Sequence, residues 1–182
     1  MPRVIHHFAI LAPVPEEHLV SGMVVAAETG FVAYGTRKWE LLREVDNRRE
    51  GDPVPVLIYP SHEDVPARDT FVVTWFGWYT GHVDSKNGAH PQGMTHRPET
   101  TAQYAADNKG LWAAFWHVES LRRLPPDKRL PISKIGTIAG GWRKNAPPRG
   151  PELVALPEIL ESRLGTDGGS FPRRRPQRDP AR

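Results

Sequence analysis

The apolar residues of this chain occur in short runs that glycine, proline and polar residues interrupt. Runs of β-branched and aromatic residues bounded in this way are typical of β-strands. The run at 111–124 also fits a buried helix, and we prefer a strand because a Lys109-Gly110 break precedes it. The pattern thus predicts strands over residues 4–11, 54–59, 70–83 and 111–124, with further short apolar segments at 30–35 and 132–138.

Helical signals are fewer. Residues 15–19 place a proline and two acids in a first turn, which suits a short helix. Residues 151–164 carry leucine and isoleucine at helical spacing with glutamates between them, which predicts a terminal helix. Residues 38–45 mix helical and strand signals, and both alternatives stay open.

These elements together predict an α+β fold. Many short strands with glycine and proline between them favour a small, curved β-barrel-like sheet with peripheral helices. The length of 182 residues suits one domain, which we place at 1–164. Residues 165–182 are rich in Gly, Pro, Ser and Arg and contain one large apolar residue, so we expect a disordered basic tail there.

Composition removes several function classes. The chain has no cysteine, which excludes disulfides, thiolate metal sites and a cysteine nucleophile and agrees with a cytoplasmic protein. No apolar stretch approaches the roughly 20 residues that span a bilayer, and no signal peptide is visible, so we expect no membrane partner. No glycine-rich phosphate loop or dinucleotide fingerprint occurs either.

Charge is distributed unevenly along the chain. Residues 1–85 carry 7 basic and 12 acidic side chains, a net charge of −5. Residues 86–149 carry 11 basic and 4 acidic side chains, a net charge of +7. Such asymmetry can orient a polyanion, and it fits equally a chain that folds back so that its halves neutralise each other.

The most informative motif is the aromatic run at 75–79. In a strand, Trp75 and Tyr79 share one face with Gly77 between them, and Phe76 and Trp78 share the other. A glycine between two aromatic rings leaves a slot that a flat ligand could enter. The alternative is that both faces are buried, since aromatic residues dominate protein cores.

A second aromatic run repeats this layout. Trp112, Ala114 and Trp116 alternate onto one face if residues 111–124 form a strand. Nearby histidines have spacings that match no tight metal motif, so we expect no metal and no cofactor. Basic residues interleaved with aromatic ones fit nucleic-acid binding, although an ordinary solvated surface has the same composition.

The order of several stretches carries a family resemblance. They are Gly30–Gly35 followed by Thr36-Arg37-Lys38, Glu50-Gly51-Asp52 before the strand Val56–Tyr59, the long strand Phe71–Val83, His96-Arg97-Pro98, Leu111–Leu124, and Leu130–Ser133. In this order, over about residues 3–160, they resemble the PUA-like superfamily, and within it the EVE, ASCH and YTH-like domains.

The resemblance implies a small curved barrel with an aromatic cage that takes a modified or flipped base. It makes nucleic acid, DNA or RNA, the expected partner. The implied cage residues are Tyr34, Trp75, Trp78, Tyr79 and Trp116, and the implied contacts to the nucleic-acid backbone are Arg37, Lys38, Arg97, Arg143 and Lys144.

Three functions remain open at this stage. The first is a non-enzymatic module that recognises a nucleobase, and we prefer it. The second is a small ASCH-type hydrolase acting on modified nucleosides or RNA, with Lys38, Thr74 or Glu119 in the pocket. The third is a protein-interaction module that uses the loop at 84–100.

Overall fold

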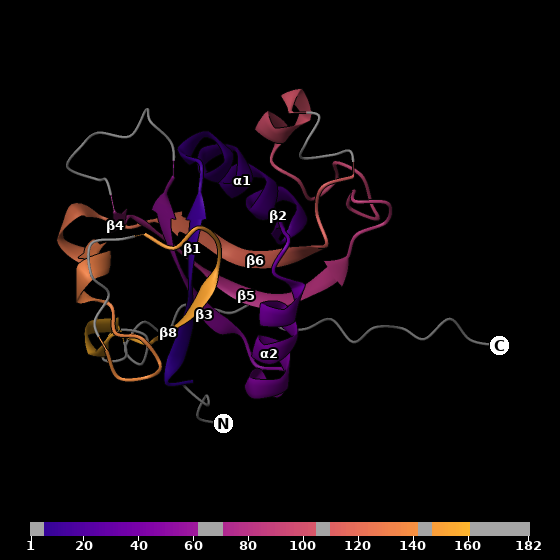
Figure 1. Ribbon diagram of the computed structural model, residues 1–182. Coiled ribbons are helices and arrows are strands. Elements are labelled where there is room, and N and C mark those ends of the chain that lie inside the picture. Colours follow the sequence, from indigo (N-terminus) through magenta and orange to yellow (C-terminus); the bar gives the residue numbers. More distant parts are fainter. Residues whose placement is uncertain (1–5, 62–70, 105–109, 142–146, 161–182) are drawn as a thin grey trace.

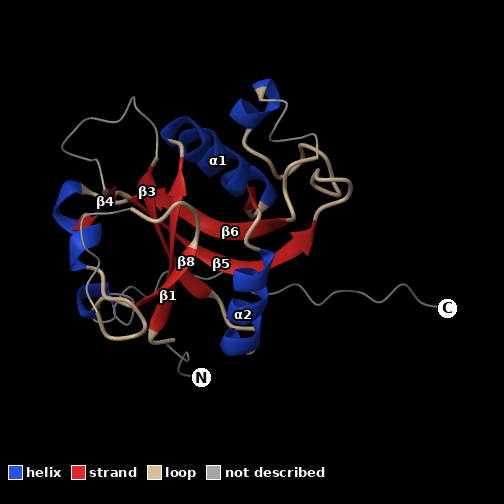
Figure 2. Ribbon diagram, in the orientation of Figure 1, coloured by secondary structure: helices blue, strands red, loops and turns tan. Residues whose placement is uncertain are grey.

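The computed structural model describes residues 6–61, 71–104, 110–141 and 147–160. They form a six-stranded sheet in the order β2-β6-β5-β3-β1-β8, together with helices and a separate two-stranded sheet of β4 and β7 (Figures 1 and 2). The α+β class expected from the sequence is confirmed. The strands are β1 (Phe8–Val14), β2 (Val32–Thr36), β3 (Val54–Pro60), β4 (Val72–Val73), β5 (Trp75–Asp84), β6 (Ala114–Arg123), β7 (Leu130–Pro131) and β8 (Glu152–Ala155).

The large sheet is mixed and open. β1 and β3 are parallel, whereas the other neighbouring pairs are antiparallel. β2 and β8 lie at opposite ends of the strand order, so the sheet does not close into the barrel-like form that was expected. β1 and β2 follow each other in the chain but are separated in the sheet by β6, β5 and β3, and the first helix makes this crossing (Figure 1).

Two α-helices connect the early strands: α1 (Glu16–Thr29) and α2 (Trp39–Arg49). α2 resolves the mixed signals at 38–45 in favour of a helix. α1 is longer than the short helix expected at 15–19, and it ends where Gly30 adopts a left-handed φ of 96° and returns its N–H to the carbonyl of Ala26. In the described part of the chain, no helix has the length and apolar character needed to cross a membrane.

Three short 3₁₀ helices also lie in the described part of the chain. They are η2 (Glu99–Gln103), η3 (Pro126–Lys128) and η4 (Ile132–Lys134). η2 packs beside α1, whereas η4 supplies Ile132 to the core on the other face of the sheet. η2 therefore occupies the side of the molecule that carries the cavity described below.

Each face of the large sheet carries a hydrophobic core. One core joins Trp75, Tyr79 and Trp116 to apolar residues of α1 and α2. The other contains Phe76, with Trp78 packed against it. The prediction that alternate residues of the 75–79 run point to opposite faces is therefore confirmed.

The prediction of a terminal helix over 151–164 is wrong for residues 152–155. Residues 152–155 form β8, which pairs antiparallel with β1, and Val154 is fully buried. The free edge of β1 accounts for this, because a strand there satisfies backbone groups that a helix would leave unpaired. Helical structure begins only at Glu158, and the expected disordered tail at 165–182 lies outside the described residues.

Candidate functional site

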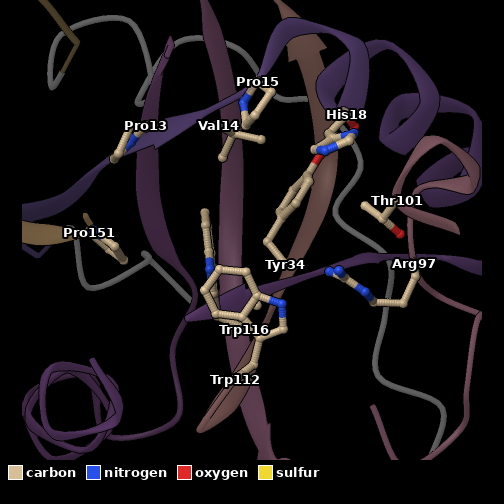
Figure 3. Close-up of a pocket in the computed structure, with 11 residues that line it drawn as sticks. Pro13, Val14, Pro15, His18, Tyr34, Arg97, Thr101, Trp112, Trp116 and Pro151 are labelled. Carbon is tan, nitrogen blue, oxygen red and sulfur yellow. The ribbon is translucent and has the colours of Figure 1, made fainter. Parts of the chain in front are cut away.

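A cavity of about 190 Å³ lies where the start of α1 meets β2, β6 and η2 (Figure 3). Five chain segments contribute to its wall, so distant parts of the sequence build it together. The lining residues are Pro13, Val14, Pro15, His18, Tyr34, Gly35, Arg97, Thr101, Trp112, Trp116 and Pro151.

Three aromatic side chains dominate this wall. Tyr34 on β2 and Trp116 on β6 lie on paired positions of neighbouring strands, and their ring centroids are 5.4 Å apart. Both are almost fully buried, at 4% and 2% exposure. Trp112 precedes β6 and lies with Trp116 at the base of the view in Figure 3, below Tyr34. The Tyr34 and Trp116 rings are tilted at 44° and pack directly on each other, so they form one continuous aromatic part of the wall.

The absence of a side chain at Gly35 makes room for the indole of Trp112. A Cβ atom at position 35 would lie 2.5 Å from Cγ of Trp112, which is closer than such atoms approach. The indole therefore lies directly against the backbone of β2, and only glycine leaves room for it. The hydrogen bond from the Ala113 amide to the Thr36 carbonyl, 3.0 Å long, fixes the chain beside it.

Arg97 is the charged group of the cavity. Its side chain is only 2% exposed, and Nη1 donates a 2.8 Å hydrogen bond to the carbonyl of Ala33. The guanidinium also lies over the ring of Phe115, 4.9 Å from its centroid. In Figure 3 it points toward the two tryptophans. Arg97 therefore brings a buried positive charge to the cavity wall.

The loop that carries Arg97 is fastened to the edge of β2. The amide of Ala33 donates to the carbonyl of His96 over 2.7 Å, and Arg97 returns its own bond to the Ala33 carbonyl. This pair of bonds covers a strand edge that would otherwise be unpaired. It also anchors Arg97, which belongs to a loop, to the edge of β2.

His18 and Thr101 complete the polar part of the wall. Nδ1 of His18 shares a 2.8 Å hydrogen bond with Oγ1 of Thr100, and the hydroxyl of Thr101 donates to the Pro98 carbonyl over 2.7 Å. The hydroxyl of Tyr34 donates to the carbonyl of His18 over 3.2 Å. Burial raises the pKa of Tyr34 far above its ordinary value, so this hydroxyl stays protonated and remains a donor.

Two exposed cations stand at the rim. Nε of Arg37 donates to the carbonyl of Leu111, the neighbour of Trp112, over 3.3 Å. Nζ of Lys38 donates to the carbonyl of Pro151, itself a lining residue, over 3.2 Å. The segment after β2 therefore holds one positive charge near each of two parts of the cavity wall.

The structure brings together only part of the residue set expected from the sequence. Around the cavity it gathers Tyr34, Trp116 and Arg97 in the wall and Arg37 and Lys38 at the rim. The expected backbone contacts Arg143 and Lys144 lie outside the described residues.

The 75–79 run contributes to the cores and does not line the cavity. Trp75 is 1% exposed, and its Nε1 donates a 2.9 Å hydrogen bond to Glu16. The space beside Gly77, expected to be an open slot, is filled by the side chain of Val118 on β6. Neighbouring strand β6 thus occupies the position that a ligand ring would need.

Tyr79 and Trp78 also have protein partners. Tyr79 is fully buried, and its hydroxyl donates to Asp46 over 3.1 Å on the α2 side. Trp78 is half-buried on the opposite face, with its ring edge-on to Phe76 at 5.3 Å between centroids.

The residues considered for catalysis are dispersed. Thr74 is 1% exposed and Glu119 pairs with Trp78 in the β5–β6 ladder, and neither lines the cavity. Of that set, Lys38 alone comes to the rim. Trp112, His18 and Thr101 line the cavity without having been chosen as site residues. The aromatic–small–aromatic pattern at 112–116 was a usable signal for Trp112, whereas isolated polar residues such as His18 and Thr101 gave none.

A histidine cluster lies beside the Arg97 loop. Phe31 is stacked on His96 at 4.0 Å and contacts His117 at 4.3 Å between centroids, and His90 lies 6.1 Å from each histidine. Burial lowers the pKa of His90 and of His117 to about 4. Among the described residues, no group of three or more histidines and acids is arranged to hold a metal ion.

Comparison of the chain with protein-family models, with curated proteins and with solved structures gives no match. The wall combines the aromatic side chains of Tyr34, Trp112 and Trp116 with the buried positive charge of Arg97.

Proposed function

We propose that this protein is a nucleic-acid-binding module of PUA-like type that receives one unstacked nucleobase, modified or not, in the cavity. The observation that carries the proposal is the combination of three aromatic side chains with one buried arginine around a single hollow. Proteins that bind unstacked bases use aromatic side chains and arginine planes in this way.

The size of the cavity supports a single base. Its volume of about 190 Å³ is smaller than the roughly 300–1,000 Å³ typical of pockets that enclose whole drug-sized ligands. The cavity volume suits a flat heterocycle, whereas a complete nucleotide would project beyond it. The sugar and phosphate of such a ligand would therefore lie at the rim.

The rim has the charge that a phosphate needs. Arg37 and Lys38 are exposed, and each is hydrogen-bonded to a backbone carbonyl next to or within the cavity wall. Exposed cations that hold phosphates position a nucleic acid without reading its sequence. This supports a division in which the rim holds the backbone and the cavity selects the base.

The test measures the equilibrium binding of short single-stranded RNA and DNA by fluorescence anisotropy, at a series of salt concentrations. The logarithm of the binding constant should fall linearly with the logarithm of the salt concentration, because each phosphate contact releases counterions. Trp112→Ala should weaken binding by roughly 5- to 150-fold, the equivalent of about 1–3 kcal/mol of base stacking.

Trp39→Ala is the matched control. Trp39 is a tryptophan on α2 that is 38% exposed and packs against Arg43 outside the cavity. Its removal should leave affinity unchanged. Absence of binding by any oligonucleotide at low salt, or equal losses in both tryptophan variants, contradicts the proposal.

A further inference from the structure

The outer edge of β2 reaches the cavity at Gly35. β2 is the last strand at one end of the six-stranded sheet, so one of its two edges has no neighbouring strand. Gly35 belongs to β2, lines the cavity and is partly exposed. The direction of its backbone N–H and C=O groups therefore decides what this part of the wall offers to a ligand.

Two hydrogen bonds of β2 fix that direction. In a strand, the N–H and C=O of one residue point to the same edge, and those of the next residue point to the opposite edge. The amide of Ala33 donates to the carbonyl of His96 at the outer edge, whereas the carbonyl of Thr36 accepts from the amide of Ala113, directly before β6. Ala33 thus points outward and Thr36 inward. Gly35 therefore presents both its N–H and its C=O at the outer edge, away from β6.

Both backbone groups of Gly35 are available to a ligand. Apart from its place in the β2–β6 ladder, Gly35 makes no hydrogen bond to another residue in the part of the chain that the structure describes. On the same edge, the N–H and C=O of Ala33 are already bonded to His96 and Arg97, so an added peptide strand could not continue along β2. The open edge fits a small flat group that has one acceptor beside one donor.

The indole of Trp112 borders this edge from one side. It covers the face of Gly35 that would carry a side chain, with Cγ 2.5 Å from the position of a Cβ. A Cβ stands out of the plane of a sheet, whereas the backbone N–H and C=O lie within it. A ring that pairs with Gly35 would therefore have Trp112 beside its face. It does not need to enter between Tyr34 and Trp116, whose rings pack on each other.

On the basis of the function proposed above, we propose that the backbone N–H and C=O of Gly35 read the Watson–Crick edge of one unpaired base. Each base presents an acceptor beside a donor on that edge, and single-stranded bases are commonly recognised there. In adenine and cytosine these are a ring nitrogen and an amino group, and in guanine and uracil a carbonyl oxygen and a ring N–H. The cavity thus tolerates different bases and rejects a base whose Watson–Crick edge is blocked.

The experiment compares short single-stranded oligonucleotides of uridine, 3-methyluridine and 5-methyluridine on the unmodified full chain, by fluorescence anisotropy at low salt. All three carry the same phosphates. The methyl group of 3-methyluridine replaces the N–H of the Watson–Crick edge, whereas that of 5-methyluridine lies outside this edge. Uridine and 5-methyluridine should bind about equally. Binding of 3-methyluridine should be weaker by roughly tenfold, because the methyl group removes one hydrogen bond and holds the ring away from the other.

A second arm compares Gly35→Pro with Gly35→Ala. Both variants place a Cβ against Trp112, and only proline removes the backbone N–H. Proline breaks no ladder bond here, because the N–H of residue 35 faces the outer edge. Gly35→Pro should bind the uridine oligonucleotide roughly fivefold more weakly than Gly35→Ala, as expected for the loss of one neutral hydrogen bond. Circular dichroism reports whether both variants are folded, and the oligonucleotide series decides the question if one is not.

The two proposals fail in different ways. Equal binding of uridine and 3-methyluridine overturns the reading of the Watson–Crick edge while base binding at the cavity stands. Equal losses with both methylated oligonucleotides overturn it too, because bulk alone would then be rejected, and so do equal affinities of folded Gly35→Pro and Gly35→Ala. Failure of every oligonucleotide to bind at low salt overturns the proposed function and the role of Gly35 with it.

Discussion

Gly22 on α1 faces the hydroxyl end of Tyr34 on β2, and no Cβ atom fits between them. A Cβ built at position 22 lies 3.2 Å from Cζ of Tyr34 and closer still to its hydroxyl oxygen. The helix therefore approaches the sheet at a point where it has no side chain. This close approach lets the Tyr34 hydroxyl reach the carbonyl of His18, and the Tyr34 side chain lines the cavity.

Gly22→Ala should consequently destabilise the fold even though alanine is the better helix former. Overpacking typically costs about 1–3 kcal/mol, against a gain of roughly 0.5–1 kcal/mol from replacing glycine within a helix. Thermal unfolding measures the difference. The double variant Gly22→Ala/Tyr34→Phe lacks the clashing hydroxyl and should recover part of the loss. A single Gly22→Ala protein more stable than the parent contradicts the packing described here.

Gly35→Ala should act on the site more than on the fold. The new Cβ displaces the indole of Trp112, so base binding should fall about tenfold, at the low end of a stacking contribution of about 1–3 kcal/mol. Gly136→Ala is the matched control, because its Cβ would meet its nearest atoms at 3.6 Å, an ordinary contact. Titration of oligonucleotide against both variants compares them. An unchanged affinity in Gly35→Ala excludes Trp112 from the binding wall.

Trp75→Phe tests whether Trp75 serves the hydrophobic core or a ligand site. The substitution removes the hydrogen bond to Glu16 and leaves part of the core volume empty. Loss of that buried bond, together with the void left in the core, should lower the free energy of unfolding by about 1–3 kcal/mol. Oligonucleotide affinity should stay the same. Urea unfolding and anisotropy on one preparation give both numbers. A selective loss of affinity with unchanged stability places a ligand at the 75–79 run instead.

Acid should weaken the fold through the histidine cluster. His90 and His117 have a pKa of about 4 in the folded chain, below the ordinary 6.5, because burial disfavours the charged ring. Between pH 6.5 and 4 the unfolded chain binds protons that the folded chain does not, so the free energy of unfolding falls as pH decreases through this window. Above it the contribution is constant.

Urea titrations at several pH values in this range measure the slope. His117→Phe replaces one titrating ring of the cluster by a ring that stays neutral, and it should flatten the slope. The same steep slope in parent and variant assigns the acid sensitivity to other groups.

Local patterns predicted most strands correctly, because alternation and turn residues act within a few positions. The runs at 54–59 and 111–124 became β3 and β6, and the two-face division of 75–79 became the two cores. The pattern misled at 152–155, where leucine spacing suggested a helix but the free edge of β1 recruited a strand. An unpaired edge is a property of the assembled sheet, and no local pattern reports it.

The sequence by itself determined the α+β class, the positions of the aromatic rings and the cations at 37, 38 and 97. Only the tertiary structure decided which rings surround a cavity. Gly77 looked like the open place, yet β6 lies against it and Val118 fills the space, whereas Gly35 admits Trp112 beside Tyr34 and Trp116. The physical reason is that strand alternation fixes the direction of a side chain, while the neighbouring strand and helix fix whether anything already occupies the space it faces.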